Sequence, residues 1–188
     1  MYDQPPLEPA APTRYVPPPR TGVKHAVRRL VMTAFGLLAA PFTLFYRLTG
    51  RHASTFASIM QVGCLVPALP GLFFRQALLR SMATRCGDSV GVHLGTTFSS
   101  PDVQIGDHVY VGLFCSIGRA HIDDWVLIGS HVNVLSGKHQ HGYDRLDIPI
   151  ALQPGRKECV SIGYGTWVGN GAIIMADAVM SLDNVIAI

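Results

Sequence analysis

The sequence predicts a mainly β protein in which short strands coil around a narrow three-sided interior, preceded by an α-helical N-terminal extension. Three observations lead to this fold class. From residue 105 onward an aliphatic residue, often followed by glycine, returns every six residues, with a single five-residue step from Ile117 to Ile122. A small or β-branched residue follows most of these four positions later, and one polar segment, residues 136–160, interrupts the repeat. The pattern predicts about four coils with one protruding loop.

A period of six fits neither a heptad nor an amphipathic helix, whose apolar residues recur three and four positions apart. It fits a prism in which each hexad forms one face and three hexads close one coil. The aliphatic residues expected to line the interior are Ile105, Val111, Ile117, Ile122, Ile128, Val134, Ile162, Val168, Ile174, Met180 and Ile186. The smaller residues expected beside them are Val109, Cys115, Val126, Val132, Thr166, Ala172 and Ala178. The glycines are expected at tight corners, where the absence of a Cβ atom permits strained backbone angles.

The N-terminal part divides into two segments. Residues 1–28 are rich in proline and basic residues, which predicts a disordered tail. Residues 29–85 are expected to form an apolar helical extension. Within it, residues 30–46 carry no charge and contain Pro41, and basic residues flank both ends. Seventeen uncharged residues lie at the lower limit for a membrane-spanning helix.

Two roles for this extension stay open. A basic flank beside an apolar stretch suits a helix that lies on an anionic membrane surface, here through residues 24–51. Alternatively, the helices pack on the first coil and cover its open strand edges, as the amphipathic pattern of residues 72–82 favours. Four helix-breaking residues, Gly63, Pro67, Pro70 and Gly71, argue against a straight membrane span through residues 53–74.

Charge and cysteine content restrict the function classes. Residues 1–86 hold ten Lys/Arg against two Asp/Glu, and residues 87–188 hold five against ten. The repeat half lacks a basic stripe with interleaved aromatic residues, so we expect no nucleic-acid partner. The four cysteines are widely spaced and form no CxxC pair, which favours a reducing compartment. We therefore expect a cytoplasmic protein, with attachment to the inner face of the membrane as the open alternative.

The hexads of residues 86–188 resemble those of the hexapeptide-repeat acyltransferases, whose fold is a left-handed parallel β-helix. Around the loop the sequence resembles more narrowly the sugar and xenobiotic O-acetyltransferases. In that group a small-residue step and a histidine precede the loop, and an aromatic hexad follows it. Here Ser136-Gly137-Lys138-His139 matches the first element, and the hexad containing Trp167-Val168-Gly169 matches the second.

This resemblance implies that His139 is a general base. It would take the proton from an acceptor hydroxyl, which then attacks the thioester of acetyl-CoA directly. A backbone N–H of a facing coil would hold the developing oxyanion. His141 is the second choice for the base, since the loop register is open. Tyr143 and Asp144 would either contact the acceptor or lie in solvent, and a loop histidine without a catalytic role is also an alternative.

The resemblance further implies a homotrimer in which each active site lies between two neighbouring prisms. Acetyl-CoA, the co-substrate, would lie along a groove lined by Trp167, Gly169, Gly171, Ala172 and Ala176. Trp167 fits a trimer contact equally well. Members of the family usually continue past the position of Ile188, so we expect the chain to be truncated at its C-terminus and its CoA contacts to be affected.

The expected acceptor is a saccharide or glycan, because a surface-glycan substrate suits a protein near the membrane. An antibiotic or other xenobiotic and the amine of a nucleotide sugar are alternative acceptors. A related β-helix family binds zinc through three histidines and acts as a carbonic anhydrase. The His-x4-His spacing of that family is absent here, so no metal is expected. An inactive β-helix that serves only in assembly remains the non-enzymatic alternative.

Overall fold

The computed structural model describes residues 14–18, 22–137 and 140–175. Within these ranges three helices precede the strands: α1 (Val23–Leu48), α2 (Ala53–Cys64) and α3 (Ala68–Met82). The strands are short, and one 3-10 helix, η1 (Ile150–Leu152), lies in the loop between β9 and β10. Their bounds are β1 (Arg85–Cys86), β2 (Gly91–Val92), β3 (Thr97–Phe98), β4 (Gln104–Ile105), β5 (Tyr110–Val111), β6 (Ser116–Ile117), β7 (Ala120–Ile122), β8 (Leu127–Ile128), β9 (Asn133–Leu135), β10 (Val160–Ile162), β11 (Trp167–Val168) and β12 (Ile173–Met175).

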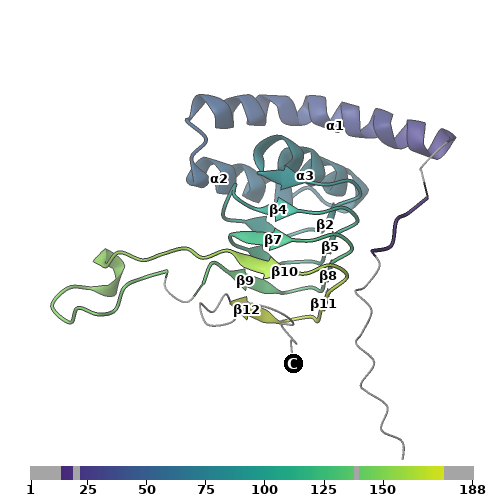
Figure 1. The fold of residues 1–188 in the computed structure, drawn as a ribbon. Helices are drawn as coiled ribbons and strands as arrows, with labels where there is room; N and C mark the ends of the chain where they lie inside the picture. Colours follow the sequence, from purple (N-terminus) through teal and green to yellow (C-terminus); the bar gives the residue numbers. More distant parts are fainter. Residues whose placement is uncertain (1–13, 19–21, 138–139, 176–188) are drawn as a thin grey trace, which may run out of the picture.

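Every third strand of the described chain joins the same sheet. The three sheets have the orders β1-β4-β7-β10, β2-β5-β8-β11 and β3-β6-β9-β12, here named sheets A, B and C, and all neighbouring strands are parallel. The chain therefore passes through the three sheets in turn, and each turn adds one strand to each sheet (Figure 1). This arrangement of four strands per sheet is compatible with a parallel β-helix.

The aliphatic residues of the hexads stack on one another and fill the interior between the sheets. Ile105 pairs with Ile122 in sheet A, and Ile117 pairs with Val134 in sheet C. The described aliphatic positions predicted from the repeat are all buried: Ile105, Val111, Ile117, Ile122, Ile128, Val134, Ile162, Val168 and Ile174. Met180, Ile186 and Ala178 lie outside the described residues. The sixfold period thus predicted the interior correctly.

The coils begin earlier than the glycine pattern indicates. Cys86, Val92 and Phe98 occupy the interior positions of a first coil, six residues apart, and pair with the strands of the next coil. Only the first of the three is followed by glycine, and Phe98 is aromatic rather than aliphatic. The strict pattern that starts at residue 105 therefore does not include these three positions, although they lie within the predicted domain of residues 86–188.

The glycines of the repeat have a different role from the one predicted. The backbone at Gly106, Gly112 and Gly129 does not adopt a positive φ angle, so these residues are not needed for strained corners. They are needed because the coils approach closely. A Cβ atom at Gly112 would lie 2.6 Å from the carbonyl carbon of Gly129, in the backbone of the next coil. The expectation of glycine at strained corners was wrong at these positions.

The left-handed backbone occurs instead three positions after the interior aliphatic residues. His108, Phe114, Trp125 and His131 have φ angles between 53° and 62°. This conformation is uncommon for residues with a Cβ atom. Their rings stack between coils: the ring centroids of His108 and Trp125 are 4.0 Å apart, and those of Phe114 and His131 are 5.6 Å apart. The favourable energy of this stacking offsets part of the energetic cost of the left-handed backbone conformation.

Polar side chains link the corners of successive coils. The carboxylate Oδ1 of Asp107 accepts a hydrogen bond from the backbone N–H of Asp88 at 2.6 Å. Asp124 Oδ1 likewise accepts a hydrogen bond from the backbone N–H of Asp107 at 2.7 Å. At another corner, Asn170 Oδ1 accepts from the N–H of Ser130 at 2.7 Å. Corner N–H groups that have no strand partner are thereby satisfied.

A buried arginine attaches the helices to the first coil. Arg75 of α3 is only 1 % exposed. Its Nε donates to the carbonyl oxygen of Val92 at 2.7 Å, and its Nη1 donates to the carbonyls of Gly63 (3.1 Å) and Val66 (2.7 Å). Val92 lies on the first strand of sheet B, where no further strand covers the edge. Burial lowers the pKa of Arg75, and the three carbonyls compensate for the desolvated charge.

The helices cover the end of the stack, and α1 lies across the top of the molecule (Figure 1). The chain breaks between α2 and α3, as Pro67 and its neighbours predicted, whereas α1 continues through Pro41. The first helix begins at Val23, inside the predicted tail. Within the described part of that tail, Tyr15 packs edge-on against Trp125, with ring centroids 5.3 Å apart, and Arg14 forms a 2.7 Å ion pair with Asp123.

We predict that Gly112→Ala destabilises the protein by about 1–3 kcal/mol, because the new methyl group would press on backbone atoms that cannot rotate away. Gly91→Ala is the matched control, since no atom lies within 4 Å of a Cβ at that position. Urea unfolding followed by circular dichroism measures both. Equal unfolding midpoints for the two variants would contradict close coil stacking as the reason for glycine.

Candidate functional site

The loop leaves the stack after β9 and returns at β10, so it emerges at the corner between sheets C and A (Figure 1). Its base is tightly packed. Ser136 is buried; its Oγ accepts from the N–H of Arg119 at 2.8 Å, and its carbonyl accepts from the N–H of Glu158 at 2.7 Å. Gly137 has a φ angle of +88°, which favours glycine. The small-residue step recognised in the sequence is thus required by the backbone.

Glu158 lies at the base of the loop and was not identified in the sequence analysis. A Cβ atom at Gly137 would collide with the carboxylate Oε2 of Glu158, so this carboxylate lies directly over the start of the loop. Its side chain is largely buried, and Oε1 accepts from Arg156 Nη2 at 2.7 Å. The sequence offers only a weak signal for Glu158, because this residue lies directly after Lys157 in a polar stretch without a recognisable motif. Folding brings it back beside the segment that carries the histidines.

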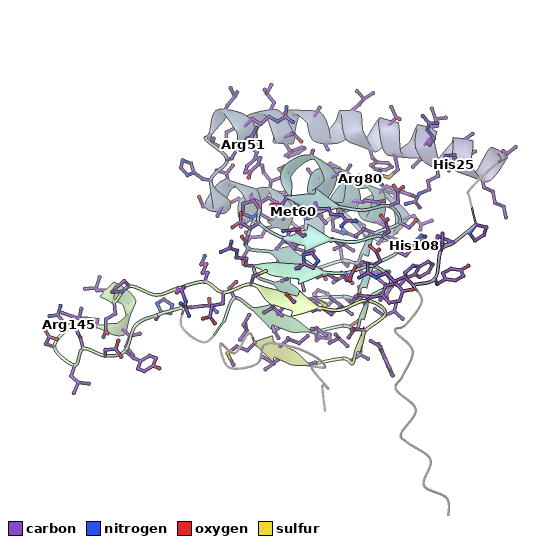
Figure 2. The ribbon with its side chains drawn as sticks, viewed as in Figure 1. His25, Arg51, Met60, Arg80, His108 and Arg145 are labelled. Carbon is purple, nitrogen blue, oxygen red and sulfur yellow. The ribbon has the colours of Figure 1, made fainter. Side chains whose placement is uncertain are left out.

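The two arms of the loop pack against each other. A Cβ atom at Gly155 would collide with the carbonyl oxygen of Gln140, and one at Gly142 would lie 2.7 Å from the carbonyl oxygen of Pro154. Farther out, the buried amide of Gln153 donates to the carbonyl of Arg145 at 2.7 Å and accepts from its N–H at 3.2 Å. Figure 2 shows Arg145 at the far end of this projection. The two sides of the described part of the loop, residues 140–160, therefore contact each other and form a projecting arm.

The predicted loop residues have different surroundings. His139 lies outside the described residues, and so does Ala176. His141 and Asp144 are exposed, and Tyr143 is 62 % exposed. The arrangement leaves these described side chains accessible to an acceptor.

The outer face of sheet B is apolar, whereas the outer face of sheet A carries polar residues and that of sheet C is mixed, with Ile173 and Met175 exposed on β12. Tyr110, Leu127 and Trp167 stand in one row across β5, β8 and β11. With Asn170 they line an open depression of about 400 Å³. Trp167 is 78 % exposed, which is unusual for the largest apolar side chain. The aromatic corner at His108 borders the same side of the stack (Figure 2).

The remaining residues of the predicted groove follow Trp167 along the chain. Gly169 and Ala172 are half-buried, and Gly171 is exposed with a φ angle of +74° at the turn before β12. They lie at the corner between sheets B and C. The loop emerges at the corner between sheets C and A, on the side of the stack away from sheet B. One chain therefore does not bring the loop residues and Trp167 together.

The cysteines provide no suitable nucleophile in the stack. Burial raises the pKa of the Cys86 thiol to about 12, and burial also raises the pKa of Cys115. Both thiols are consequently protonated near neutral pH, and a thiolate is the reactive form. Cys159, beside Glu158 at the loop base, is exposed. Within the described ranges, His, Cys, Asp and Glu side chains form no group of three or more that could hold a metal ion.

Comparisons of the sequence with models of protein families, with curated proteins and with solved structures find no match. A function for this chain is therefore inferred from its own residues and their arrangement.

We predict that iodoacetamide at pH 8 modifies Cys159 of the folded protein and leaves Cys86 and Cys115 unmodified. A thiol with a pKa of about 12 has a thiolate fraction of roughly one in ten thousand at that pH. Mass spectrometry of proteolytic fragments measures the labelled sites, and labelling in urea is the control. Rapid modification of Cys115 under native conditions would contradict its placement in the interior.

Proposed function

We propose that residues 86–188 form a left-handed parallel β-helix that acts as an acetyl-CoA-dependent O-acetyltransferase. The supporting observation is the combination of a three-sheet stack with a six-residue period and one projecting arm at a corner. That arm begins with the Ser136-Gly137-Lys138-His139 segment, and the next coil carries Trp167-Val168-Gly169. Resemblance to the hexapeptide-repeat acyltransferases adds the reaction type. No cofactor beyond the acyl donor and no metal enter this proposal.

In the proposed reaction His139 accepts the proton of an acceptor hydroxyl. The hydroxyl oxygen attacks the thioester carbonyl, the C–O bond forms, and the C–S bond breaks. The protonated imidazole then returns its proton to the leaving thiolate of CoA. Direct transfer is favoured over an acyl-cysteine intermediate because the pKa values of Cys86 and Cys115 are raised.

Glu158 is proposed as a positioning residue for His139. Its carboxylate lies over Gly137, two residues before that histidine. A carboxylate that accepts the N–H of an imidazole fixes the tautomer whose other nitrogen can act as a base. Tyr143 and Asp144 are exposed on the same arm and are proposed to contact the acceptor.

A trimer would unite the two halves of the site. The arm and the face bearing Trp167 lie on different sides of one prism. A cyclic assembly would place the arm of each prism against sheet B of its neighbour. Apolar exposed faces of this kind mark interaction surfaces. Acetyl-CoA would then lie between the prisms, along Trp167, Gly169, Gly171 and Ala172 towards Ala176.

The proposed acceptor is a hydroxyl of a saccharide or glycan. The exposed polar arm can contact such a molecule through hydroxyl, carboxylate and imidazole groups, which suit sugar hydroxyls.

We predict that His139→Ala lowers kcat by roughly 10²–10⁴-fold, the usual loss for a general base. His141→Ala, the matched control, should stay near the wild-type rate. Glu158→Gln should lower kcat with little change in KM, and Glu158→Asp should recover part of the rate. Release of CoA thiol from acetyl-CoA across a panel of sugars measures all four variants.

An unchanged rate for His139→Ala would make the base assignment wrong, and loss of activity in His141→Ala alone would transfer the role to His141. Thermal melting of each variant separates loss of chemistry from loss of folding. If the wild type releases no thiol with any saccharide, xenobiotic or nucleotide-sugar acceptor, the non-enzymatic assembly role gains support.

We also predict complementation between two impaired variants in a mixed trimer. His139→Ala lacks the base and Trp167→Ala lacks the groove, so each alone should be slow at subsaturating acetyl-CoA. Refolding them together should restore up to about a quarter of the wild-type rate, because one of three sites in each mixed trimer is intact. No recovery, with trimers confirmed by light scattering, would contradict a site shared between subunits.

A further inference from the structure

We infer that the outer face of α1 is a docking surface for an anionic lipid bilayer, with the helix axis parallel to the membrane plane. This inference concerns the opposite end of the molecule from the proposed acetyltransferase site and does not depend on it. The starting observation is that α1 is apolar on two opposite sides. One side packs on α3, and the other forms the top of the molecule (Figure 1).

The outer side of α1 carries a continuous apolar row. Leu30, Leu37 and Leu44 recur seven residues apart and are each more than half exposed, and Phe45 and Leu48 extend the row. No charged residue occurs between Leu30 and Tyr46. By length and composition α1 is the one described helix that could cross a membrane, and only 17 % of its most apolar stretch is buried. A helix that is apolar on all sides is normally buried, so we expect the exposed apolar side of α1 to bind another surface.

The inner side of α1 is attached to the helical cap along most of its length. Thr43 Oγ1 donates to Ser81 Oγ at 2.8 Å. The rings of Phe35 and Phe42 contact those of Phe73 and Phe74, with centroids 5.7 Å apart in both pairs. The cap in turn is fixed to the first coil through Arg75. If α1 crossed a bilayer in this state, the polar groups of α3 would enter the hydrocarbon at a high cost.

Pro41 also favours a helix that lies in the plane of the membrane interface over a helix that spans the membrane. It lies inside α1 and has no N–H to donate to the carbonyl oxygen of Leu37. Water and lipid headgroups can satisfy that carbonyl at the interface, whereas hydrocarbon cannot. Pro41 is exposed on the outer side, so the freed carbonyl lies where headgroups would be.

The charges of the helical part identify the lipid as anionic. Residues 22–82 contain no Asp or Glu, and their basic residues are Lys24, Arg28, Arg29, Arg47, Arg51, Arg75 and Arg80. Arg29 and Arg47 are about five turns apart at 3.6 residues per turn, so they project from the same flank at the two ends of the apolar row. Both are exposed. Such long side chains can reach phosphate groups while the leucines enter the acyl region.

Flotation of the full chain with vesicles tests the inference. The probes are vesicles of phosphatidylcholine alone and of phosphatidylcholine mixed with phosphatidylglycerol. We expect binding to the mixed vesicles that weakens with salt. Leu37→Glu/Leu44→Glu should weaken it at least about tenfold, since burial of each leucine among the acyl chains favours binding and a carboxylate there opposes it. The matched control is Leu146→Glu/Leu152→Glu, which adds the same charge on the exposed arm and should bind like the wild type.

A second double variant, Arg29→Gln/Arg47→Gln, should lose the preference for phosphatidylglycerol while keeping its fold. Circular dichroism and thermal melting check the fold, which should be kept because Arg29 and Arg47 are exposed. The inference is overturned if the wild type stays unbound to anionic vesicles at low salt, or if Leu37→Glu/Leu44→Glu binds like the wild type. It is also overturned if the bound wild type resists alkaline carbonate, which indicates a spanning helix. Self-association in lipid-free solution that Leu37→Glu/Leu44→Glu abolishes would instead assign the face to a second copy of the chain.

Discussion

Close stacking of successive coils is the constraint on which the rest of the described structure depends. Parallel strands of neighbouring coils lie roughly 4.8 Å apart, so every position that faces the next coil must fit within that distance. Gly112 is required because a Cβ atom there would press on Gly129. The same spacing lets Asp107 reach the N–H of Asp88 and lets His108 stack on Trp125. Core packing, corner hydrogen bonds and aromatic columns therefore share one geometric cause.

The stack places its exposed apolar face and its projecting arm on different sides of the molecule. Sheet B presents an apolar face around Trp167, while the projecting arm with Glu158 at its base emerges at the corner between the other two sheets. A rigid prism cannot bend to unite them. In the proposed trimer, rotational symmetry would bring them together, and each proposed site would be shared between two subunits.

The helical cap covers one end of the stack, so the two ends of the molecule differ. Arg75 satisfies the open edge of sheet B and connects two helices to the first coil. Because α1 rests on this cap, its apolar row faces away from the stack (Figure 1). On the inferred membrane surface, the arm would lie at the height of the later coils and project sideways from the stack (Figure 1). Such a placement suits a substrate in the adjoining aqueous phase.

The sequence by itself determined the interior, because side chains six residues apart must face the same way when each hexad forms one face of a coil. Ile105, Val111 and Ile117 are buried as that period requires. It also determined the helix break at Pro67. Only the tertiary structure decided that corner glycines serve close approach, that Glu158 lies over Gly137, and that Arg75 closes the sheet edge. These contacts join residues from different coils or elements, and a local pattern carries no information about such pairs.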